Sequence, residues 1–302
     1  MLACLEGELL IPQTVCHLTC AKSYSPCGKK ITKFHWSGAG VVFVPNADVP
    51  APTATLNAAG EIQICLEVWD EDGVKSCAPK CQSLLVIPTN ALHVDLLWHT
   101  PADKDETDSG PGAGAALDLH FANQLASTLD IDCDGVPDPW FDNPNDVNWF
   151  NSTPEWGKPG FADDNATLDL DDTDGAGPEN LNLKAPEGSV AQPVAYSLGV
   201  NYWTDHGYGP SFATVAIWVS GAKAAAFADQ KLDPCDMWYV GKINWPNKLS
   251  GGTLPVIDVC HQTGLACLMG KNAMWQPAGD PCITPKYVNA MANPAIGGGA
   301  CQ

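Results

Sequence analysis

The stretch GEIQICLEVWDEDGVKS, residues 60–76, decides the fold of the N-terminal part of the chain. Its apolar residues between positions 62 and 68 fall at every second position, so they share one face of a β-strand. DEDG (70–73) follows as a hairpin-type turn, and SLLVIP (83–88) predicts the strand that closes the hairpin. Because no helical periodicity of useful length appears around this stretch, we predict that this part of the chain is all-β.

Residues nearer the N-terminus extend this pattern to a known type of domain. SYSPCGKKITKFHW (23–36), followed by GEIQICLEVWDEDGVKS, resembles the PKD domain, a small immunoglobulin-like sandwich of secreted and surface proteins. The resemblance covers most of residues 8–88, although SGAGVVF follows Trp36 where the family carries a W-x-F-G-D-G run. It implies an Ig-like β-sandwich as the first domain, residues 1–90.

A second set of strands is predicted between residues 91 and 246. Apolar residues alternate in LHVDLLW (92–98) and in YSLGVNYW (196–203), so each of these strands presents one face to a core. FATVAIWV (212–219) and MWYVGKI (237–243) are further strands. We therefore predict a second β-sandwich in this region.

Long loops and a cysteine-rich tail accompany these strands. Residues 100–190 are rich in Asp, Asn, Gly and Pro, and structureless loops beyond ~15 residues are uncommon unless they are functional or bind a ligand. Residues 247–302 are rich in Gly, Pro and Cys, so we expect disulfides to order them. The predicted fold class is all-β, with two β-sandwich domains at 1–90 and 91–246 and a disulfide-rich tail.

The charge of the chain excludes one class of partner and suggests another. The 302 residues include 35 acidic and 15 basic ones, a formal net charge of −20, whereas nucleic-acid binding requires a basic surface. No apolar run approaches the ~18 residues of a membrane span. Residues 91–190 hold 21 acids and three lysines, a net charge of −18. Such crowding opposes compaction unless bound cations offset it.

The cysteines indicate an oxidising compartment. Seven of the 13 cysteines lie within residues 1–88, five lie within 235–301, and only Cys133 lies between them. Disulfides are favoured over zinc, because the close pairs are spaced C-x3-C and lack neighbouring C-x2-C knuckles. The odd count leaves at least one thiol free or intermolecular. The opening MLACLEGELLIP lacks the basic start and apolar segment of a signal peptide, so we expect a chain that begins at a domain edge.

An acidic loop predicts a calcium site. Residues 130–142 read DIDCDGVPDPWFD, and a calcium loop winds around its ion with alternate side chains and a glycine at the sharp turn, here Gly135. The twelfth position is Phe141 instead of the glutamate of an EF-hand, so we predict a D-x-D-x-D-G-x-x-D loop of the extracellular type. The alternative is a solvated acidic turn. The predicted Ca2+ ligands are Asp130, Asp132, Asp134, the carbonyl of Val136, and Asp138.

A second acidic cluster lies in DDNATLDLDDTDGAGPEN (163–180) and is less regular. Aspartate and backbone oxygens select hard cations over zinc or copper, so Ca2+ is again the predicted ion, with a solvated loop as the alternative. The predicted ligands here are Asp169, Asp171, Asp172, Asp174 and Glu179.

The same region resembles a module of bacterial surface proteins that also ends some secreted peptidases. The similar segments are LDLHF (117–121), DTDGAGPENLNL (172–183) and YSLGVNYW, with Ala116 in place of the first acid of the family's D-L-D-L-H strand. The run at 93–114 is similar to large bacterial surface proteins that combine such a module with a PKD-like domain. The resemblance implies a secreted or cell-surface location. Its matching site residues are Asp118, His120, Asp174 and Glu179.

No common catalytic motif occurs: the chain has no HExxH, GxSxG or GxxxxGK[ST], and no GxGxxG after a strand. His93 with Asp95, and Asp205 with His206, are candidate acid–base pairs, but a lone Asp–His pair near a turn is more often structural. We therefore predict a non-catalytic, calcium-binding protein of the bacterial cell exterior that acts in adhesion, assembly or spacing.

Aromatic residues provide an alternative function. Trp140, Trp149, Trp156 and Trp203 lie in or beside the acidic loops, and aromatic rings stack on sugars. The alternative is a calcium-dependent carbohydrate-binding module, against the simpler interpretation that these rings form a local core. The partners considered are a surface glycan, a partner protein and further copies of the chain.

Overall fold

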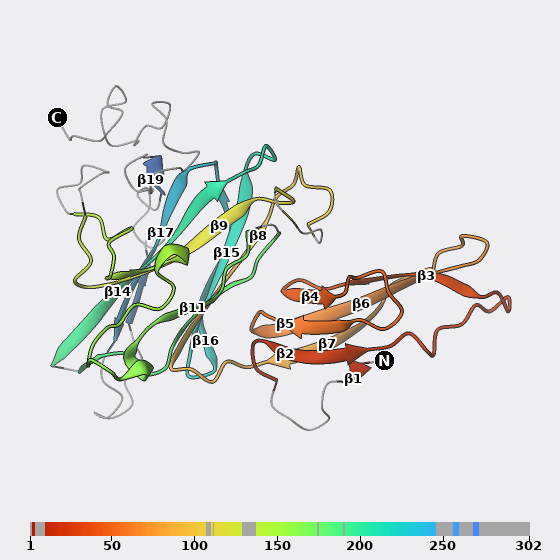
Figure 1. Cartoon of the computed structure of the whole chain (residues 1–302), viewed down its shortest axis with the longest axis horizontal. Helices are drawn as coiled ribbons and strands as arrows, with labels where there is room; N and C mark the ends of the chain where they lie inside the picture. The colour runs from red at the N-terminus through yellow and green to blue at the C-terminus, as the bar shows by residue number, and fades with distance from the viewer. Residues whose placement is uncertain are drawn as a thin grey trace. The chain divides into compact units, whose positions relative to one another are not determined.

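The structure, a computed structural model, is nearly all β, as predicted, and divides into two units, Met1–Thr89 and Asn90–Gln302 (Figure 1). In the described part of the chain, no helix is long and apolar enough to cross a membrane. The described residues are 2–3, 10–106, 110, 112–128, 137–173, 175–189, 191–245, 256–259 and 268–271.

The first unit contains two antiparallel sheets, with strand orders β1-β2-β5-β4 and β3-β6-β7. Ile62 and Ile64 on β6 are buried, as their alternation predicts, and Leu56 of the other sheet is fully buried too. Each sheet therefore contributes one apolar face to a core. The strands are β1 (Leu2–Ala3), β2 (Thr14–Leu18), β3 (Ile31–Ser37), β4 (Val41–Val44), β5 (Thr53–Leu56), β6 (Gly60–Asp70) and β7 (Lys80–Val86).

A disulfide and a side-chain-stabilised turn hold the β6–β7 hairpin. Cys65 and Cys81 are cross-strand partners and form a disulfide. At the turn, the Asp70 carboxylate accepts hydrogen bonds from the backbone N–H groups of Asp72 (3.1 Å) and Val74 (2.9 Å). The predicted turn is thus a hydrogen-bonded one, in which aspartate replaces missing backbone partners.

The close cysteine pairs do not form zinc knuckles. In each C-x3-C pair one cysteine is in a disulfide, Cys16 or Cys81, and the other, Cys20 or Cys77, is a free thiol. Disulfides are therefore confirmed, and Cys235 in the second unit forms one as well. The predicted disulfides of the 247–302 tail lie outside the described residues.

The second unit also contains two sheets, with strand orders β10-β9-β14-β17-β18 and β11-β12-β8-β15-β16; β13 also pairs with β14, and β19 with β17 (Figure 1). Two short 3-10 turns, η1 (Trp149–Asn151) and η2 (Ala162–Asp164), lie in the long insert. The strands are β8 (Leu92–His99), β9 (Ala116–Asn123), β10 (Asp146–Val147), β11 (Thr167–Leu170), β12 (Glu179–Leu183), β13 (Gly188–Ser189), β14 (Gln192–Thr204), β15 (Ser211–Val219), β16 (Ala222–Leu232), β17 (Asp236–Trp245), β18 (Val256–Val259) and β19 (Leu268–Lys271).

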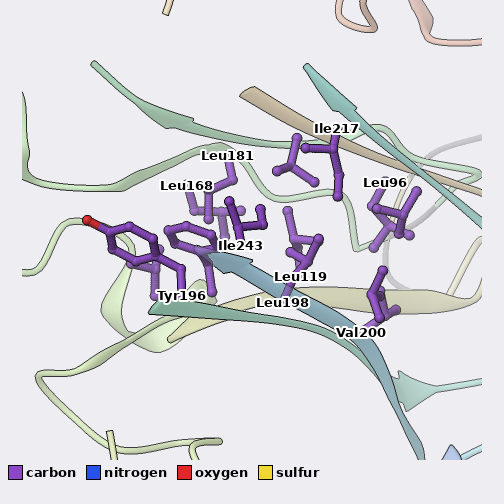
Figure 2. Close-up of a cluster of buried hydrophobic side chains, with 14 of the residues drawn as sticks. Leu96, Leu119, Leu168, Leu181, Tyr196, Leu198, Val200, Ile217 and Ile243 are labelled. Carbon is purple, nitrogen blue, oxygen red and sulfur yellow. The ribbon is translucent and has the colours of Figure 1, made fainter. Parts of the chain in front are cut away.

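A core of aliphatic and aromatic side chains separates the two sheets of the second unit (Figure 2). It receives Leu96 and Ile217 from one sheet and Leu119, Leu198 and Ile243 from the other, all at most 1% exposed. The period-two pattern of the sequence therefore identifies the inward faces correctly, because a sandwich buries one face of each sheet.

Three features of the second unit differ from the sequence prediction. The long loop-rich insert contributes strands of its own, since it supplies β9 and β10 to one sheet and β11 and β12 to the other. Strand β16 was not anticipated, because its sequence AKAAAFADQKL carries few residues of high strand propensity. The segment after residue 246, predicted as a loop-dominated tail ordered by disulfides, supplies β18 and β19, which both pair with β17.

Candidate cation site

The candidate site begins on β9, whose two faces have opposite chemistry. Leu117, Leu119 and Phe121 point into the core, so Asp118 and His120 lie on the opposite, outward face of the same sheet. Both polar residues are nevertheless buried, with 3% and 0% of their surface exposed. An outward face that is covered in this way requires a partner for each polar group.

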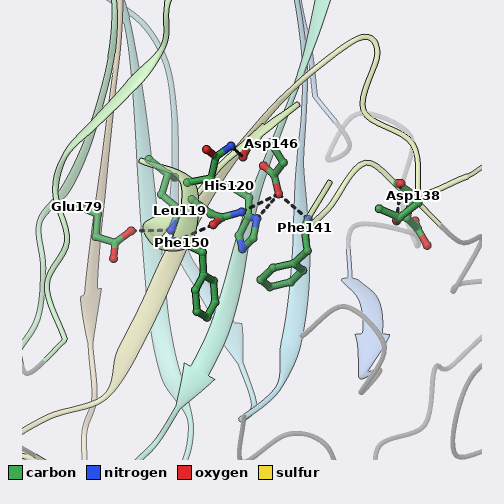
Figure 3. Close-up of polar contacts among 10 residues, drawn as sticks. Leu119, His120, Asp138, Phe141, Asp146, Phe150 and Glu179 are labelled. Atoms are coloured by element: carbon green, nitrogen blue, oxygen red, sulfur yellow. Dashed lines mark hydrogen bonds and ion pairs between the residues drawn. The ribbon is translucent and has the colours of Figure 1, made fainter. Parts of the chain in front are cut away.

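Glu179, at the start of β12, joins this site from the other sheet. Its carboxylate oxygen Oε2 accepts a hydrogen bond of 2.6 Å from the backbone N–H of Leu119 (Figure 3). The side chain is fully buried, and its second oxygen, Oε1, accepts no hydrogen bond. Glu179 therefore bridges the two sheets with one oxygen and leaves the other available.

Three carboxylates converge at this point. One carboxylate oxygen from each of Asp118, Asp171 and Glu179 lies within 4.8 Å of the others, and Asp171 follows directly after β11. Oxygens that bind one calcium ion at ~2.3–2.6 Å can be at most ~5 Å apart, so the spacing suits a shared ion. Neither Asp171 nor Glu179 forms an ion pair with a lysine among the described residues.

The electrostatics of the cluster favour a positive ligand. Burial, followed by the negative charges of Asp118 and Asp171, raises the pKa of the Glu179 carboxyl well above its ordinary value. The hydrogen bond from Leu119 lowers this pKa but does not outweigh those effects. Carboxylates crowded together in this way need a proton or a cation between them, and oxygen ligands select Ca2+ or Mg2+ over softer metals.

Other predicted ligands take different places. Asp169 accepts hydrogen bonds from Thr167 Oγ1 (2.9 Å) and from the amide of Asn182, and Asp172 is half-buried beside Gly175. Asp138 is buried, and its backbone carbonyl accepts hydrogen bonds from Thr128. The predictions for Asp130, Asp132, Asp134, Val136 and Asp174 lie outside the described residues.

His120 belongs to a network that sequence analysis did not anticipate. Its Nδ1 lies 2.7 Å from Asp146 Oδ2, and the same oxygen accepts hydrogen bonds from the Phe141 N–H (2.6 Å) and the Asn148 amide (3.3 Å) (Figure 3). Asp146 thereby holds the loop with Phe141 against β9. The other ring nitrogen of His120, Nε2, is buried without a hydrogen-bond partner. No sequence signal distinguished Asp146 from the many other aspartates.

The four candidate tryptophans divide into buried and exposed ones. Trp140 is fully buried, and a Cβ atom added at Gly199 would lie 2.6 Å from its ring. Trp156 is 5% exposed and stacks on Phe121. The structure therefore does not present these two rings to a surface ligand, because each fills part of the protein interior.

Trp149 and Trp203, by contrast, form a surface cluster with Phe150. Both Trp149 and Phe150 lie 5.7 Å from Trp203 between ring centroids, and they are 38% and 42% exposed. This three-ring cluster combines Trp149 and Phe150 of η1 with Trp203 of β14. Of the four tryptophans considered as sugar-binding residues, the structure therefore leaves only the two in this cluster accessible.

Neither candidate acid–base pair is arranged for catalysis. His93 and Asp95 are 0% and 1% exposed, so no substrate reaches them. Asp205 instead accepts hydrogen bonds from the backbone of its own turn, at Gly207 and Gly209, and His206 Nδ1 lies 2.6 Å from a backbone oxygen. Both pairs therefore have structural roles.

The His93–Asp95 pair predicts a pH dependence of stability. Burial lowers the pKa of His93. This effect is outweighed by the hydrogen bond and charge of Asp95, the hydrogen bond to the Asn182 side chain and the charge of Asp169, so the pKa is raised overall. Since the folded pKa exceeds the unfolded one (~6.5), this stabilisation is complete below ~6.5 and is lost as pH rises through the folded pKa. We expect the free energy of unfolding, measured by urea titration, to decrease as the pH is raised through the folded pKa of His93. His93→Gln should remove that part of the decline, and an unchanged decline would contradict the assignment.

Comparison with known proteins gives little further information. No protein-family model matches the chain, and no curated protein matches its sequence. Among solved structures, the D00-D0 domain of Intimin matches with 11% sequence identity and a TM-score of 0.21, over 78% of this chain and 99% of that one. Similarity at this level is too low to assign a family or a function.

Proposed function

We propose that this chain is an extracellular, non-catalytic structural or adhesive protein whose second unit binds calcium with carboxylates from both of its sheets. Asp118 would supply an oxygen from one sheet, and Asp171 and Glu179 would supply oxygens from the other. The observation that supports this most directly is the convergence of three carboxylate oxygens within 4.8 Å, one of them on the fully buried Glu179. Hard oxygen donors exclude the softer metals, and a set of several protein carboxylates suits Ca2+ better than Mg2+, which keeps most of its water ligands.

A bound calcium ion would stabilise the second unit in a defined way. It would neutralise part of the charge of the 91–190 segment and would fix the residues that follow β11 against β9. If the free calcium concentration is ~100 times the dissociation constant, linkage adds about 2.7 kcal/mol to the free energy of unfolding. That amount is a large share of the ~5–15 kcal/mol of a typical domain, so calcium would convert long acidic loops into a rigid surface.

The location and the first unit fit the same proposal. The Cys65–Cys81 disulfide is typical of proteins in oxidising compartments, which favours a secreted or surface location. The first unit would act as a PKD-like spacer, consistent with its two packed sheets. The predicted ion in the 130–138 loop is a separate calcium site on this proposal.

The proposal predicts a calcium-dependent thermal shift. After EGTA treatment, millimolar calcium should raise the melting temperature by about 5–10 °C, as expected for a stabilisation of about 2.7 kcal/mol. Asp171→Asn combined with Glu179→Gln should lose most of this shift, because two of the charged ligands become neutral. Differential scanning calorimetry would measure both proteins.

Two further variants complete this experiment. Asp229→Asn, at an exposed position with a positive φ that asparagine accepts, is the matched control and should keep the full shift. Asp132→Ala with Asp134→Ala tests the 130–138 loop separately. A full calcium shift in the Asp171/Glu179 double variant would rule out a stabilising ion at the described cluster.

The three-ring cluster supports glycan binding as a second candidate function. Trp149 and Phe150 expose about two-fifths of their surface although they are large apolar residues, and aromatic faces of this kind stack on sugars. On a glycan array, binding should decrease at least tenfold in Trp149→Ala and in Trp203→Ala. Phe161→Ala, which removes an equally exposed ring (44%), is the matched control. Equal binding by all three variants would exclude the cluster as a sugar site.

A further inference from the structure

A buried amide side chain lies directly beside the proposed calcium site. Asn201 on β14 is the cross-strand partner of Asp118 on β9, so the two side chains project from the same outward face. Cβ atoms of directly opposed residues are ~4.5–5.5 Å apart, which brings the Asn201 amide next to the Asp118 carboxylate. Asn201 is 0% exposed, and neither its Oδ1 nor its Nδ2 has a hydrogen-bond partner.

An amide in this position is costly unless something binds it. Leaving a buried donor or acceptor unsatisfied costs ~1–3 kcal/mol for each group, and Asn201 leaves both its oxygen and its nitrogen unsatisfied. An asparagine beside a carboxylate would ordinarily donate to it, yet no such hydrogen bond forms here. A group located between the two side chains would account for both observations.

A small apolar core covers this face of the sheet beside Asn201. Met237 on β17 is the cross-strand partner of Asn201 on the side away from β9, and it packs with Trp140 and Ala122. Trp140 also covers Gly199, two residues before Asn201 on the same strand. Bulk water is therefore kept away from the Asn201 amide, which accounts for its complete burial.

We propose that Asn201 is a further ligand, through its Oδ1, of the cation bound by Asp118, Asp171 and Glu179. This inference rests on the proposed calcium site and extends it. A neutral amide oxygen suits a site that already holds three carboxylates, because it adds a ligand without adding repulsion. Calcium sites in proteins commonly combine carboxylate and amide oxygens in this way.

The amide nitrogen has a candidate partner on the same face. His120 lies diagonally opposite Asn201 across the β9–β14 ladder, since His120 pairs with Gly199. Its Nδ1 lies 2.7 Å from Asp146 and donates to that carboxylate in the neutral tautomer, which makes the unpartnered Nε2 an acceptor. A reorientation of Asn201 on ion binding would let Nδ2 donate to Nε2 while Oδ1 binds the ion. His120 would then position the ligand without contacting the metal.

The decisive variant is Asn201→Leu, which keeps the branched shape and the number of heavy atoms of the side chain and removes both of its polar atoms. Calcium affinity, measured by isothermal titration calorimetry on the full chain, should fall about tenfold or more. The melting temperature in EGTA should stay equal or rise, because an unsatisfied amide is replaced by an apolar group. Ser197→Ala, on the same face of β14, is the control and should change neither value. Asn201→Asp should retain binding, because it keeps an oxygen at that position.

The outcomes of these measurements distinguish the role of Asn201 from the proposed calcium site itself. If the wild-type chain binds no calcium, the proposed function fails. If the wild-type chain binds calcium and Asn201→Leu binds it equally well, the cation site stands and the role of Asn201 is refuted. Should Asn201→Leu not fold, Asn201→Ala gives the same comparison of affinities.

Discussion

Asp95→Ala is expected to lower the free energy of unfolding by about 3–5 kcal/mol, because it leaves a buried charge without its partner. Asp95 Oδ1 lies 2.8 Å from His93 Nε2, and its Oδ2 accepts a 2.8 Å hydrogen bond from the Trp218 indole. Asn182 directs its oxygen at His93 Nδ1, so the protonated ring can donate from both nitrogens and is the form that this arrangement stabilises. Removal of the carboxylate would strand this imidazolium and one indole N–H.

Chemical denaturation of the full chain would measure this loss. Asp95→Asn should cost less than Asp95→Ala, since the amide oxygen still accepts one of the two hydrogen bonds. Lys184→Ala removes an exposed ion pair of the same unit, Lys184–Asp163 at 3.7 Å, and should cost at most about 1 kcal/mol. A loss below about 1 kcal/mol for Asp95→Ala would mean that His93 is neutral in the folded protein.

Trp140→Ala is expected to cost a similar amount, about 3–5 kcal/mol, through loss of apolar burial and creation of a cavity. The ring is fully buried, covers Gly199 of β14 and packs with Ala122 and Met237 in a small core on the outward face of the sheet. It also meets His120 edge-on, at 6.0 Å between ring centroids. Its removal would release the loop that covers β9.

The matched control for Trp140→Ala is Trp149→Ala, a truncation of a tryptophan from the same insert that is 38% exposed. We expect this control to cost less than half as much, because less apolar surface is lost from the interior. Urea titration monitored by far-UV circular dichroism would compare them. Equal losses for the two variants would show that the outward core contributes little to stability.

The strands that the sequence predicted are those in which alternation has a simple cause. In YSLGVNYW, the four residues from Tyr196 to Tyr202 that face the core are all at most 1% exposed. β16 carries the opposite pattern: it is an edge strand with mostly exposed residues, so no buried face imposes a period on its sequence. β12 was missed for another reason. All five of its residues are buried, so burial does not alternate along this strand.

The candidate site depends on contacts that local sequence patterns do not predict. Asp171 and Glu179 could be named as possible ligands from residue type and neighbouring glycines, and Asp118 from the resemblance to a module of surface proteins. Glu179 meets Leu119 across 60 positions of sequence, however, and no local spacing predicts that encounter. Asn201 and Asp146 carry no motif at all, and they stand out only because the fold buries them.

The sequence by itself determined the all-β class, the inward face of the main strands, the acidic region and the residue types that a calcium site requires. These properties depend on period and composition, which are local. Only the tertiary structure decided which carboxylates converge, which tryptophans are buried, and that the outward faces of β8 and β9 are covered. Those properties depend on which distant segment lies over each face, and an isolated strand has no information about the segment that will cover it.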